Sequence, residues 1–389
     1  MHVGYVPADP DLTGSVRRRA RALWDVPPDV LVVTPGRIDI VGNHIDYNGG
    51  EPVAAAIDRW VALAARRRSD GIVRASVSDL GAGIAEFPIE SATAFDLRRN
   101  AAEREWSDYA RAAVAATHAA GIPCDGIDLY YRGTIPLGAG MGSFSALLVS
   151  AVAAIAQVAG ARLSRLDIAR CALEAGLRMD LPVGPLDPAI CAVGGFLRFS
   201  RDEDRIRPLV VSLGDAIFVI CDSGVRHSLS VLRYRARADE CREALALLRG
   251  AGMPIGALAE ISPADLDAAA GLLPEPLDRR VRHVVQEVER AREAEAAIEA
   301  GDCVALGALM TASGRSSATL YDISHPAVER IAAIARETPG VYGARMMGAG
   351  DGGVAVVLIE RDALPALQRQ LSGALVTLCR VARGLSMID

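Results

Sequence analysis

The stretch GTIPLGAGMGSFSALLVSAVAAIA, Gly133 to Ala156, decides the fold that this sequence predicts. It follows a strand-like run, Ile127 to Tyr131, and its proline and glycines interrupt regular structure before an apolar segment typical of a buried helix. A strand, a glycine loop and a helix in this order present free backbone N–H groups to an anion. Ser143 and Ser145 stand where the helix begins, where a hydroxyl can cap the helix or reach a Mg²⁺. Taken alone, the stretch predicts either a phosphate-binding loop or an ordinary turn before a core helix.

The composition is that of a globular protein long enough for two domains. The chain has 389 residues, of which 51% are apolar and 23% charged. Its net charge of −6 comes without a basic stripe, so we expect no nucleic-acid partner. Its seven cysteines are scattered and lack CxxC spacing, which predicts reduced thiols rather than a disulfide framework or a zinc site.

Two further features bear on location. Residues 1–15 hold acids and prolines where a signal peptide needs a basic and then an apolar run. The charge-free run from Gly133 to Ala161 is long enough for a membrane span, but its turn-forming start and Gln157 argue against one. We therefore expect a cytoplasmic protein that does not contact membranes.

A second informative stretch is TPGRIDIVGNHIDYNGG, Thr34 to Gly50, which follows the strand-like Val30 to Val33. Its alternation and the cluster Asn48-Gly49-Gly50 predict a strand, a loop and a hairpin, followed by a buried strand over Pro52–Ile57. The polar residues that it gathers are Arg37, Asp39, Asn43, His44 and Asp46. On their own they are as expected of a surface hairpin whose polar side chains are solvated or satisfy turn N–H groups.

These stretches carry a resemblance to a known family. PLGAGMGSFSA is similar to the second motif of the GHMP small-molecule kinases, Pro-x-Gly-x-Gly-Leu-[Gly/Ser]-Ser-Ser-Ala-Ala. PGRIDIVGNHIDYNGG resembles the signature of the galactokinase branch, Pro-Gly-Arg-Val-Asn-Leu-Ile-Gly-Glu-His-Thr-Asp-Tyr-Asn-Gly-Gly. GARMMGAGDGGVAVVLI, Gly343 to Ile359, matches the third GHMP motif, and DSGVRHSL, from Asp222, resembles a further galactokinase run. Three motifs in the family's order extend the resemblance over nearly the whole chain.

The resemblance implies an α+β, two-domain GHMP kinase fold. The N-terminal domain, of the ribosomal protein S5 domain 2-like type, is expected over residues 1–200, and a ferredoxin-like α+β domain over 201–389. It also implies a monomer or a weak homodimer.

The resemblance also implies a sugar site and a catalytic pair. Arg37 is expected to face the reacting hydroxyl, and Asp187 falls on the catalytic aspartate. An anomeric hydroxyl is acidic enough for a nearby carboxylate to act as base, and Arg37 would keep Asp187 ionised. Without the resemblance, Asp187 would be assigned to an Asp-Pro turn or a helix cap. The implied substrate-binding residues are Asn43, His44, Asp46, Gly184 and Tyr234, with Arg226 and His227 at the site entrance.

The implied nucleotide site is built on the glycine motifs, and its ligands are ATP and Mg²⁺. Phe144 stands at the usual magnesium-ligating serine, and an aromatic ring cannot coordinate a hard cation. Ser143 or Ser145 is expected to substitute for it, or the metal relies on Glu174 and water. Met347 and Asp351 replace a usual Thr and a usual Phe of the third motif. The expected ATP-binding residues are Pro136, Gly138, Ala139, Gly140, Met141, Gly142, Ser143, Ser145, Gly348 and Gly350.

The sequence thus predicts an ATP-dependent kinase that phosphorylates a hydroxyl, expected to be anomeric, of a monosaccharide or sugar-like acceptor such as a cyclitol. Asn43 occupies the place of a Glu that by resemblance holds the hydroxyl on the sixth sugar carbon, so we expect an acceptor other than plain galactose. The alternative is a catalytically weak sugar and ATP sensor that acts through a protein partner. The substitutions at Phe144, Met347 and Asp351 motivate that alternative, and the retained Arg37 and Asp187 count against it.

The remaining segments give a coarse secondary structure. Predicted helices are Leu12–Trp24, Trp106–Ala119 and Leu166–Leu177, with an exposed charged bundle over Pro263–Val304. Predicted strands are two within Arg59–Leu80, then Phe196–Ser200, Leu209–Val211 and Ala216–Cys221, and Asp180–Pro188 is predicted to be a loop.

Overall fold

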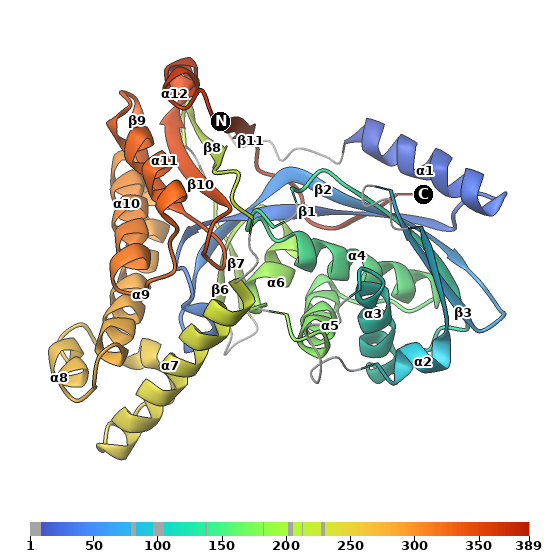
Figure 1. The fold of residues 1–389 in the computed structure, drawn as a ribbon, viewed down its shortest axis with the longest axis horizontal. Helices are drawn as coiled ribbons and strands as arrows, with labels where there is room; N and C mark the ends of the chain where they lie inside the picture. Colours follow the sequence, from blue (N-terminus) through green and yellow to red (C-terminus); the bar gives the residue numbers. More distant parts are fainter. Residues whose placement is uncertain are drawn as a thin grey trace.

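A computed structural model describes residues 9–78, 83–95, 105–136, 138–181, 183–200, 205–211, 213–226 and 230–388. Two β-sheets organise them (Figure 1). The larger sheet has eight strands, in the order β12-β1-β2-β5-β3-β4 with β6 paired to β2 and β7 to β6. These strands are β1 (Val30–Val41), β2 (Val53–Arg67), β3 (Ile72–Val77), β4 (Ile84–Pro88), β5 (Ile127–Gly133), β6 (Phe196–Ser200), β7 (Arg205–Pro208) and β12 (Ser386–Ile388).

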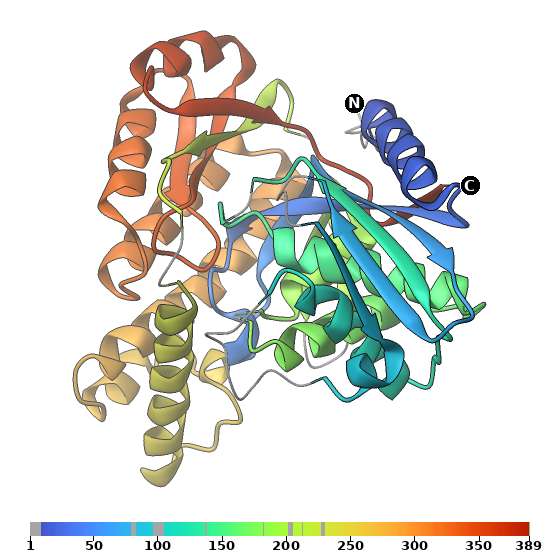
Figure 2. The ribbon, with the colours of Figure 1, turned by 45° about the vertical axis from the view of Figure 1, so that its right-hand side comes forward.

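Helices cover both faces of this sheet. Helix α4 packs on β1 and β2 and also contacts α3, α5 and α6, while α1 lies on the opposite face (Figures 1 and 2). The uncharged, alanine-rich composition of α4 suits this place, because most of its side chains are buried between the sheet and the other helices. The helices of this half are α1 (Pro10–Trp24), α2 (Ile89–Thr93), α3 (Asp108–Ala119), α4 (Ser143–Val158), α5 (Arg165–Arg178) and α6 (Leu186–Val193).

The smaller sheet has four antiparallel strands in the order β11-β8-β10-β9. Helices α10 and α11 pack against it, and α7, α8 and α9 extend away from it (Figure 1). The strands are β8 (Ala216–Asp222), β9 (Val341–Met346), β10 (Val354–Glu360) and β11 (Leu375–Cys379). The helices are α7 (Ser230–Gly250), α8 (Leu266–Gly271), α9 (Leu277–Ala300), α10 (Cys303–Thr319), α11 (Pro326–Glu337) and α12 (Leu364–Gln370), with 3-10 turns at Asp46–Asn48, Leu258–Glu260 and Arg361–Ala363.

Several predicted elements differ from the observed ones. The run Pro52–Ile57 and the first strand within Arg59–Leu80 form a single strand, β2, which continues past a bulge opposite Pro35 and Gly36. The predicted strand Leu209–Val211 is wrong: Pro208 ends β7, and the following residues have no regular secondary structure. The loop predicted over Asp180–Pro188 ends earlier than expected, because α6 begins at Leu186.

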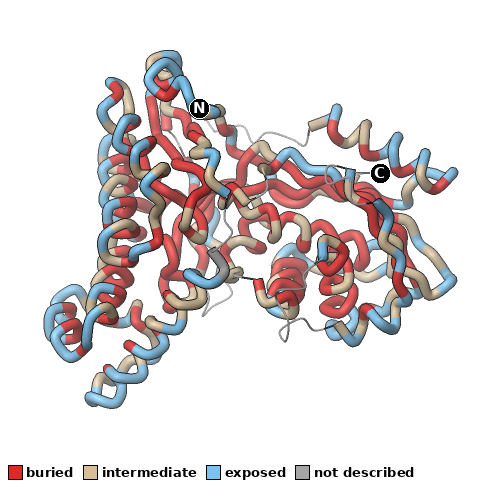
Figure 3. The backbone as a smooth tube through the Cα atoms, in the orientation of Figure 1, coloured by how far each residue is buried: buried red, intermediate tan, exposed pale blue. Residues whose placement is uncertain are grey.

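The segment Pro263–Val304 was predicted to be an exposed charged bundle, and the predicted exposure is wrong. Helix α9 is buried along much of its length (Figure 3). Its valines are buried together with four polar residues, Arg280, His283, Glu287 and Glu295. Buried charges in proteins need partners, and the partners of Glu287 lie in the site described below.

The division of the chain at residue 200 remains a proposal. The larger sheet takes β7 and β12 from the far side of that point, and β12 pairs with β1. Bridges between Ile57 and Val381 and between Gly194 and Arg383 fasten the same C-terminal segment to this sheet. In the described part of the chain, no helix has the length and apolar character needed to cross a membrane.

Candidate active site

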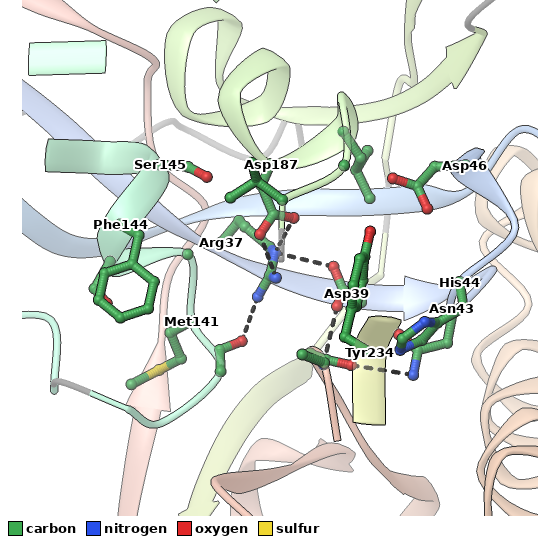
Figure 4. A pocket seen from close by; sticks show the side chains of 18 of the residues that line it. Arg37, Asp39, Asn43, His44, Asp46, Met141, Phe144, Ser145, Asp187 and Tyr234 are labelled. Carbon is green, nitrogen blue, oxygen red and sulfur yellow. Dashed lines mark hydrogen bonds and ion pairs between the residues drawn. The ribbon is translucent and has the colours of Figure 1, made fainter. Parts of the chain in front are cut away.

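An open pocket lies where the end of β1, the glycine loop before α4, the start of α6 and the turn after β9 meet (Figure 4). Its empty volume, which includes space open to solvent, is about 820 Å³. The predicted site residues that line it are Arg37, Asn43, His44, Asp46, Gly138, Gly140, Met141, Gly142, Ser143, Ser145, Gly184, Asp187, Tyr234 and Gly348. The pocket lining does not include the predicted residues Pro136, Ala139, Glu174 and Gly350.

Arg37 and Asp187 form a two-point ion pair in this pocket, although they are 150 residues apart in the sequence. Nε and Nη2 of Arg37 donate to the two carboxylate oxygens of Asp187 over 2.7 and 2.6 Å. Nη1 donates to the carbonyl of Gly140 in the glycine loop, and Asp39 Oδ1 lies 3.1 Å from Nε. Every nitrogen of the guanidinium group is therefore held by a neighbour, so its orientation is fixed (Figure 4).

Burial and charge act on this pair in opposite directions. Burial alone lowers the pKa of Arg37, but the charges of Asp187 and Asp39 raise it above its ordinary value. Burial raises the pKa of Asp187. The positive charge of Arg37 lowers this pKa, and the negative charge of Asp39 raises it, so that it lies above the ordinary value. Asp187 thus keeps a higher affinity for a proton than an exposed aspartate has, even beside an arginine.

Asn43, His44 and Asp46 line another side of the pocket, in the loop after β1. The Asn43 side chain donates to the carbonyl of Gly348 over 3.3 Å. His44 has φ +62° and is buried, and its Nε2 lacks a hydrogen-bond partner among the described residues. Burial, together with His283, lowers the pKa of His44 to about 3, so the ring is neutral at pH 7.

Asp46 is held against Gly184. A methyl group on Gly184 would overlap Oδ2 of Asp46, so only glycine leaves room for the carboxylate in this position. Burial and the charge of Asp187 raise the pKa of Asp46 to about 7. Tyr234, from α7, packs on His44 with ring centroids 5.2 Å apart and brings a third element to this side of the pocket.

The loop after β1 is anchored by a residue that sequence reasoning missed. The buried Glu287 of α9 accepts hydrogen bonds from the backbone N–H groups of Gly42 and Asn43, over 2.9 and 3.2 Å. Burial would raise its pKa, but Arg290 and His283 lower it to about 2, so the carboxylate is charged. The spacing of His283 and Glu287, four residues apart beside Val284 and Val288, was the available signal that one turn of α9 faces inward.

The glycine loop leads into α4 as the sequence predicted. The N-cap of α4 is Gly142 at φ +72°, and no side chain caps the helix. The first N–H groups of a helix lack partners within the helix, so they are available to an anion at this end. Ser143 and Ser145 both line the pocket here. Glu174 instead pairs with Arg178 on the surface of α5, with Nε and Oε1 3.0 Å apart, and the structure does not bring it to the pocket.

A second, apolar pocket adjoins the first and shares Ser143 and Phe144 with it. Phe144 stacks on Tyr109 there, with ring centroids 5.6 Å apart. The buried hydroxyl of Tyr131 has no hydrogen-bond partner in the described part of the chain. The stretch Gly133 to Ala156 supplies part of its lining, but the rest comes from β2, β3, β5, α3 and the segment before α3, so no motif predicted it as a pocket. The lining is Val61, Val77, Trp106, Tyr109, Ala110, Tyr131, Arg132, Gly133, Ile135, Ser143, Phe144 and Leu147.

The remaining predicted residues lie around these pockets. Asp351 pairs with Arg233 of α7 over 2.8 Å, and Met347 is fully buried. Arg226 pairs with Asp222 and does not line the first pocket. His227 lies outside the described residues.

Comparison with known proteins agrees with this arrangement. Residues 108–195 match the GHMP kinases N terminal domain and residues 294–377 the GHMP kinases C terminal model. Residues 21–67 match the galactokinase galactose-binding signature. Galactokinase from Roseiflexus sp. (strain RS-1) is 34% identical over 394 residues, which is 97% of each chain. The chain belongs to the galactokinase family of GHMP kinases.

Two further relatives extend this result. Human galactokinase is 30% identical over 374 residues, covering 94% of this chain and 92% of the human protein. A crystal structure of Lactococcus lactis galactokinase complexed with galactose superposes with a TM-score of 0.89 at 25% identity, over 96% of this chain and 99% of that one. The expected two-domain GHMP kinase fold of mixed helix and sheet is confirmed, and the protein is a galactokinase-type sugar kinase whose family implies the use of ATP.

Proposed function

We propose that this galactokinase family member transfers the γ-phosphoryl group of ATP to the anomeric hydroxyl of an uncharged sugar-like acceptor other than plain galactose. The observation that carries the proposal is the place of Asn43. It lines the pocket beside His44 and Asp46, at the position where the family signature has a glutamate.

Asp187 is proposed as the base and Arg37 as its partner. Phosphoryl transfer needs positioning and charge stabilisation more than covalent help. The raised pKa of Asp187 suits it to take the proton of an acidic anomeric hydroxyl. Arg37, fixed by Asp187, Asp39 and the carbonyl of Gly140, would stabilise the negative charge that develops between acceptor and phosphate.

The nucleotide is proposed to occupy both pockets. Its phosphates would meet the N-terminus of α4 and the glycine loop, and its base the apolar pocket between Tyr109, Phe144 and Tyr131. Phe144 would form one wall of this base pocket. Because its ring cannot coordinate Mg²⁺, the metal would have to be held by other ligands.

The donor set fits a Mg²⁺ bound mainly by phosphate oxygens and water. Ser143 and Ser145 would supply hydroxyl ligands, whereas Glu174 is engaged with Arg178. Within the residues that the structure describes, no group of three His, Cys, Asp or Glu side chains could hold a metal. When bound, Mg²⁺ spreads the charge of the phosphates.

The acceptor side of the pocket supports an uncharged ligand. Asn43 and His44 are neutral, and the cationic side chain in the lining, Arg37, is already paired with Asp187 and Asp39. A uronic acid would therefore bury its carboxylate without a positive partner. Loss of a charged hydrogen bond to the C6 hydroxyl costs about 1.5–3 kcal/mol, or roughly ten- to a hundredfold in affinity, which disfavours galactose.

The test is an acceptor panel with Mg-ATP, in which kcat/KM is measured for galactose, galacturonate, 6-deoxygalactose and a seven-carbon cyclitol. We expect 6-deoxygalactose or the cyclitol to exceed galactose by roughly tenfold or more, and galacturonate to be poor. A protein that prefers galactose would overturn the acceptor assignment. Binding of sugar and ATP without any phosphorylated product would instead favour the sensor alternative.

The pH dependence of kcat/KM for the acceptor follows from Asp46 and Asp187. We expect kcat/KM to rise with pH and to level off above about 7, the value to which burial raises the pKa of Asp46. Both groups act as carboxylates, Asp187 as proton acceptor and Asp46 as acceptor of a hydroxyl hydrogen bond, so protonation at lower pH removes activity. An ADP-release assay that gives a flat profile between about pH 5 and about pH 8 would contradict this assignment.

A further inference from the structure

Asp39 links the catalytic arginine to the third glycine motif. It lies two residues after Arg37 on β1, so both side chains point to the same face of the sheet. One carboxylate oxygen lies 3.1 Å from Nε of Arg37, and the other accepts the N–H of Gly348 over 3.0 Å (Figure 4). The Asp39 side chain is only 8% exposed, so both contacts are made in a largely buried site.

Asn43 contacts the same glycine, Gly348, at its carbonyl group. Its Nδ2 donates to the carbonyl of Gly348 over 3.3 Å (Figure 4). The N–H of Gly348 needs an acceptor and its carbonyl needs a donor. A carboxylate at position 39 and a carboxamide at position 43 meet these two requirements.

Gly348 closes a ring that contains both glycine motifs. A Cβ on Gly348 would lie 2.8 Å from the carbonyl oxygen of Gly140, and that carbonyl accepts from Nη1 of Arg37. Arg37, Gly140, Gly348 and Asp39 are therefore in contact one after another. These contacts connect Asp39 and Gly348 to the guanidinium group that faces Asp187.

The two positions have exchanged their functional groups relative to the family signature. The signature PGRVNLIGEH has Asn where this chain has Asp39 and Glu where it has Asn43. We propose that Asp39 and Asn43 form one coupled specificity unit, in which the carboxylate has moved from the acceptor end of the pocket to the catalytic arginine. This proposal rests on the kinase function proposed above and deepens it.

The exchange explains why a single reversion would fail. A glutamate at position 43 has no donor for the Gly348 carbonyl and would add a second carboxylate near Asp39. With asparagine at position 39, the N–H of Gly348 keeps an acceptor, and the second negative charge is gone. The acceptor end can then hold a carboxylate again.

Asp39 also acts on the base. Its charge contributes to the raised pKa values of Asp187 and Asp46. Replacing Asp39 with asparagine should therefore move the acid limb of kcat/KM to lower pH. A residue with only a structural role would reduce activity without moving this limb.

The experiment compares the full-length parent with Asp39→Asn, Asn43→Glu and the double variant. We expect Asn43→Glu to lose roughly tenfold or more in kcat/KM with every acceptor, galactose included. The double variant should recover most of this loss and shift the ratio of galactose to the best neutral acceptor by roughly tenfold toward galactose. Asp39→Asn should show the shifted acid limb. Glu86→Gln, an exposed residue paired with Arg74 on β3, is the matched control and should match the parent.

Two results would overturn the coupling: effects of the two substitutions that simply add, or an Asn43→Glu variant as active on galactose as the double variant. The melting temperatures of the parent, the two single variants and the double variant give a second double-mutant cycle, which does not depend on turnover. If no protein phosphorylates any acceptor, the kinase function fails. The melting temperatures then decide the coupling. A double variant that is more stable than Asn43→Glu would support it, and melting-temperature shifts that simply add would overturn it.

Discussion

Replacing Asp187 with asparagine is expected to lower kcat by roughly 10²- to 10⁴-fold, the usual contribution of a general base. Asparagine keeps the size of the side chain, but it cannot take up the proton of the acceptor hydroxyl. Asp187 now accepts two hydrogen bonds from Arg37, over 2.7 and 2.6 Å. Asparagine would accept only one of them, because its NH₂ group would face the other donor nitrogen. ATP affinity should change little, because the proposed phosphate and base contacts come from the glycine loop, α4 and the apolar pocket.

The measurement is steady-state turnover together with nucleotide binding for Asp187→Asn and for Asp267→Asn as a matched control. Asp267 is on the surface of α8 and pairs with Arg282 far along the chain from the pocket residues, so its variant should behave as the parent. An Asp187→Asn protein with kcat within a few-fold of the parent would show that another group takes the proton.

The sequence predicted which residues meet around Arg37 and Asp187 because motifs carry them. Arg37 and Asp187 were paired from two motifs, and the structure brings them into direct contact. The glycine loop, the start of α4 and the third glycine turn also meet as expected, with Gly140 packed on Gly348. In each case a backbone requirement, either positive φ or close approach, leaves a mark that can be read in the sequence.

The parts that were missed depend on tertiary contacts between ordinary residues. Glu287 lies in a helix full of charges, where its spacing from His283 is the local signal that it faces inward, but its partners, the backbone N–H groups of Gly42 and Asn43, come from the far end of the sequence. The apolar pocket behind Phe144 is built from a few residues each of β2, β3, β5, α3, α4 and the segments before the two helices. Glu174 shows the opposite error, because its place in the helix before Asp187 suggested a metal ligand, while its side chain pairs with Arg178 outside the pocket.

Replacing Gly184 with alanine is expected to lower kcat/KM for the acceptor by roughly a hundredfold, because a small misplacement of a substrate-positioning group has effects of that size. The added methyl group would overlap Oδ2 of Asp46, whose carboxylate must move or rotate away. Gly184 does not have a positive φ, so alanine adds no backbone strain there and the fold should be kept. ATP affinity should stay close to that of the parent.

Gly271→Ala is the matched control, because Gly271 ends α8 with open space around it and no positive φ. Its variant should keep parental kinetics, which separates the effect of a methyl group beside Asp46 from that of any glycine replacement. Because Asp46 is proposed to hold a hydroxyl of the acceptor, the loss in Gly184→Ala should shrink with acceptors that lack that hydroxyl. A Gly184→Ala protein that keeps kcat/KM for every acceptor in the panel would mean that Asp46 does not position the acceptor. Of the three residues in the loop after β1, only Asn43 and His44 would then be left as acceptor contacts.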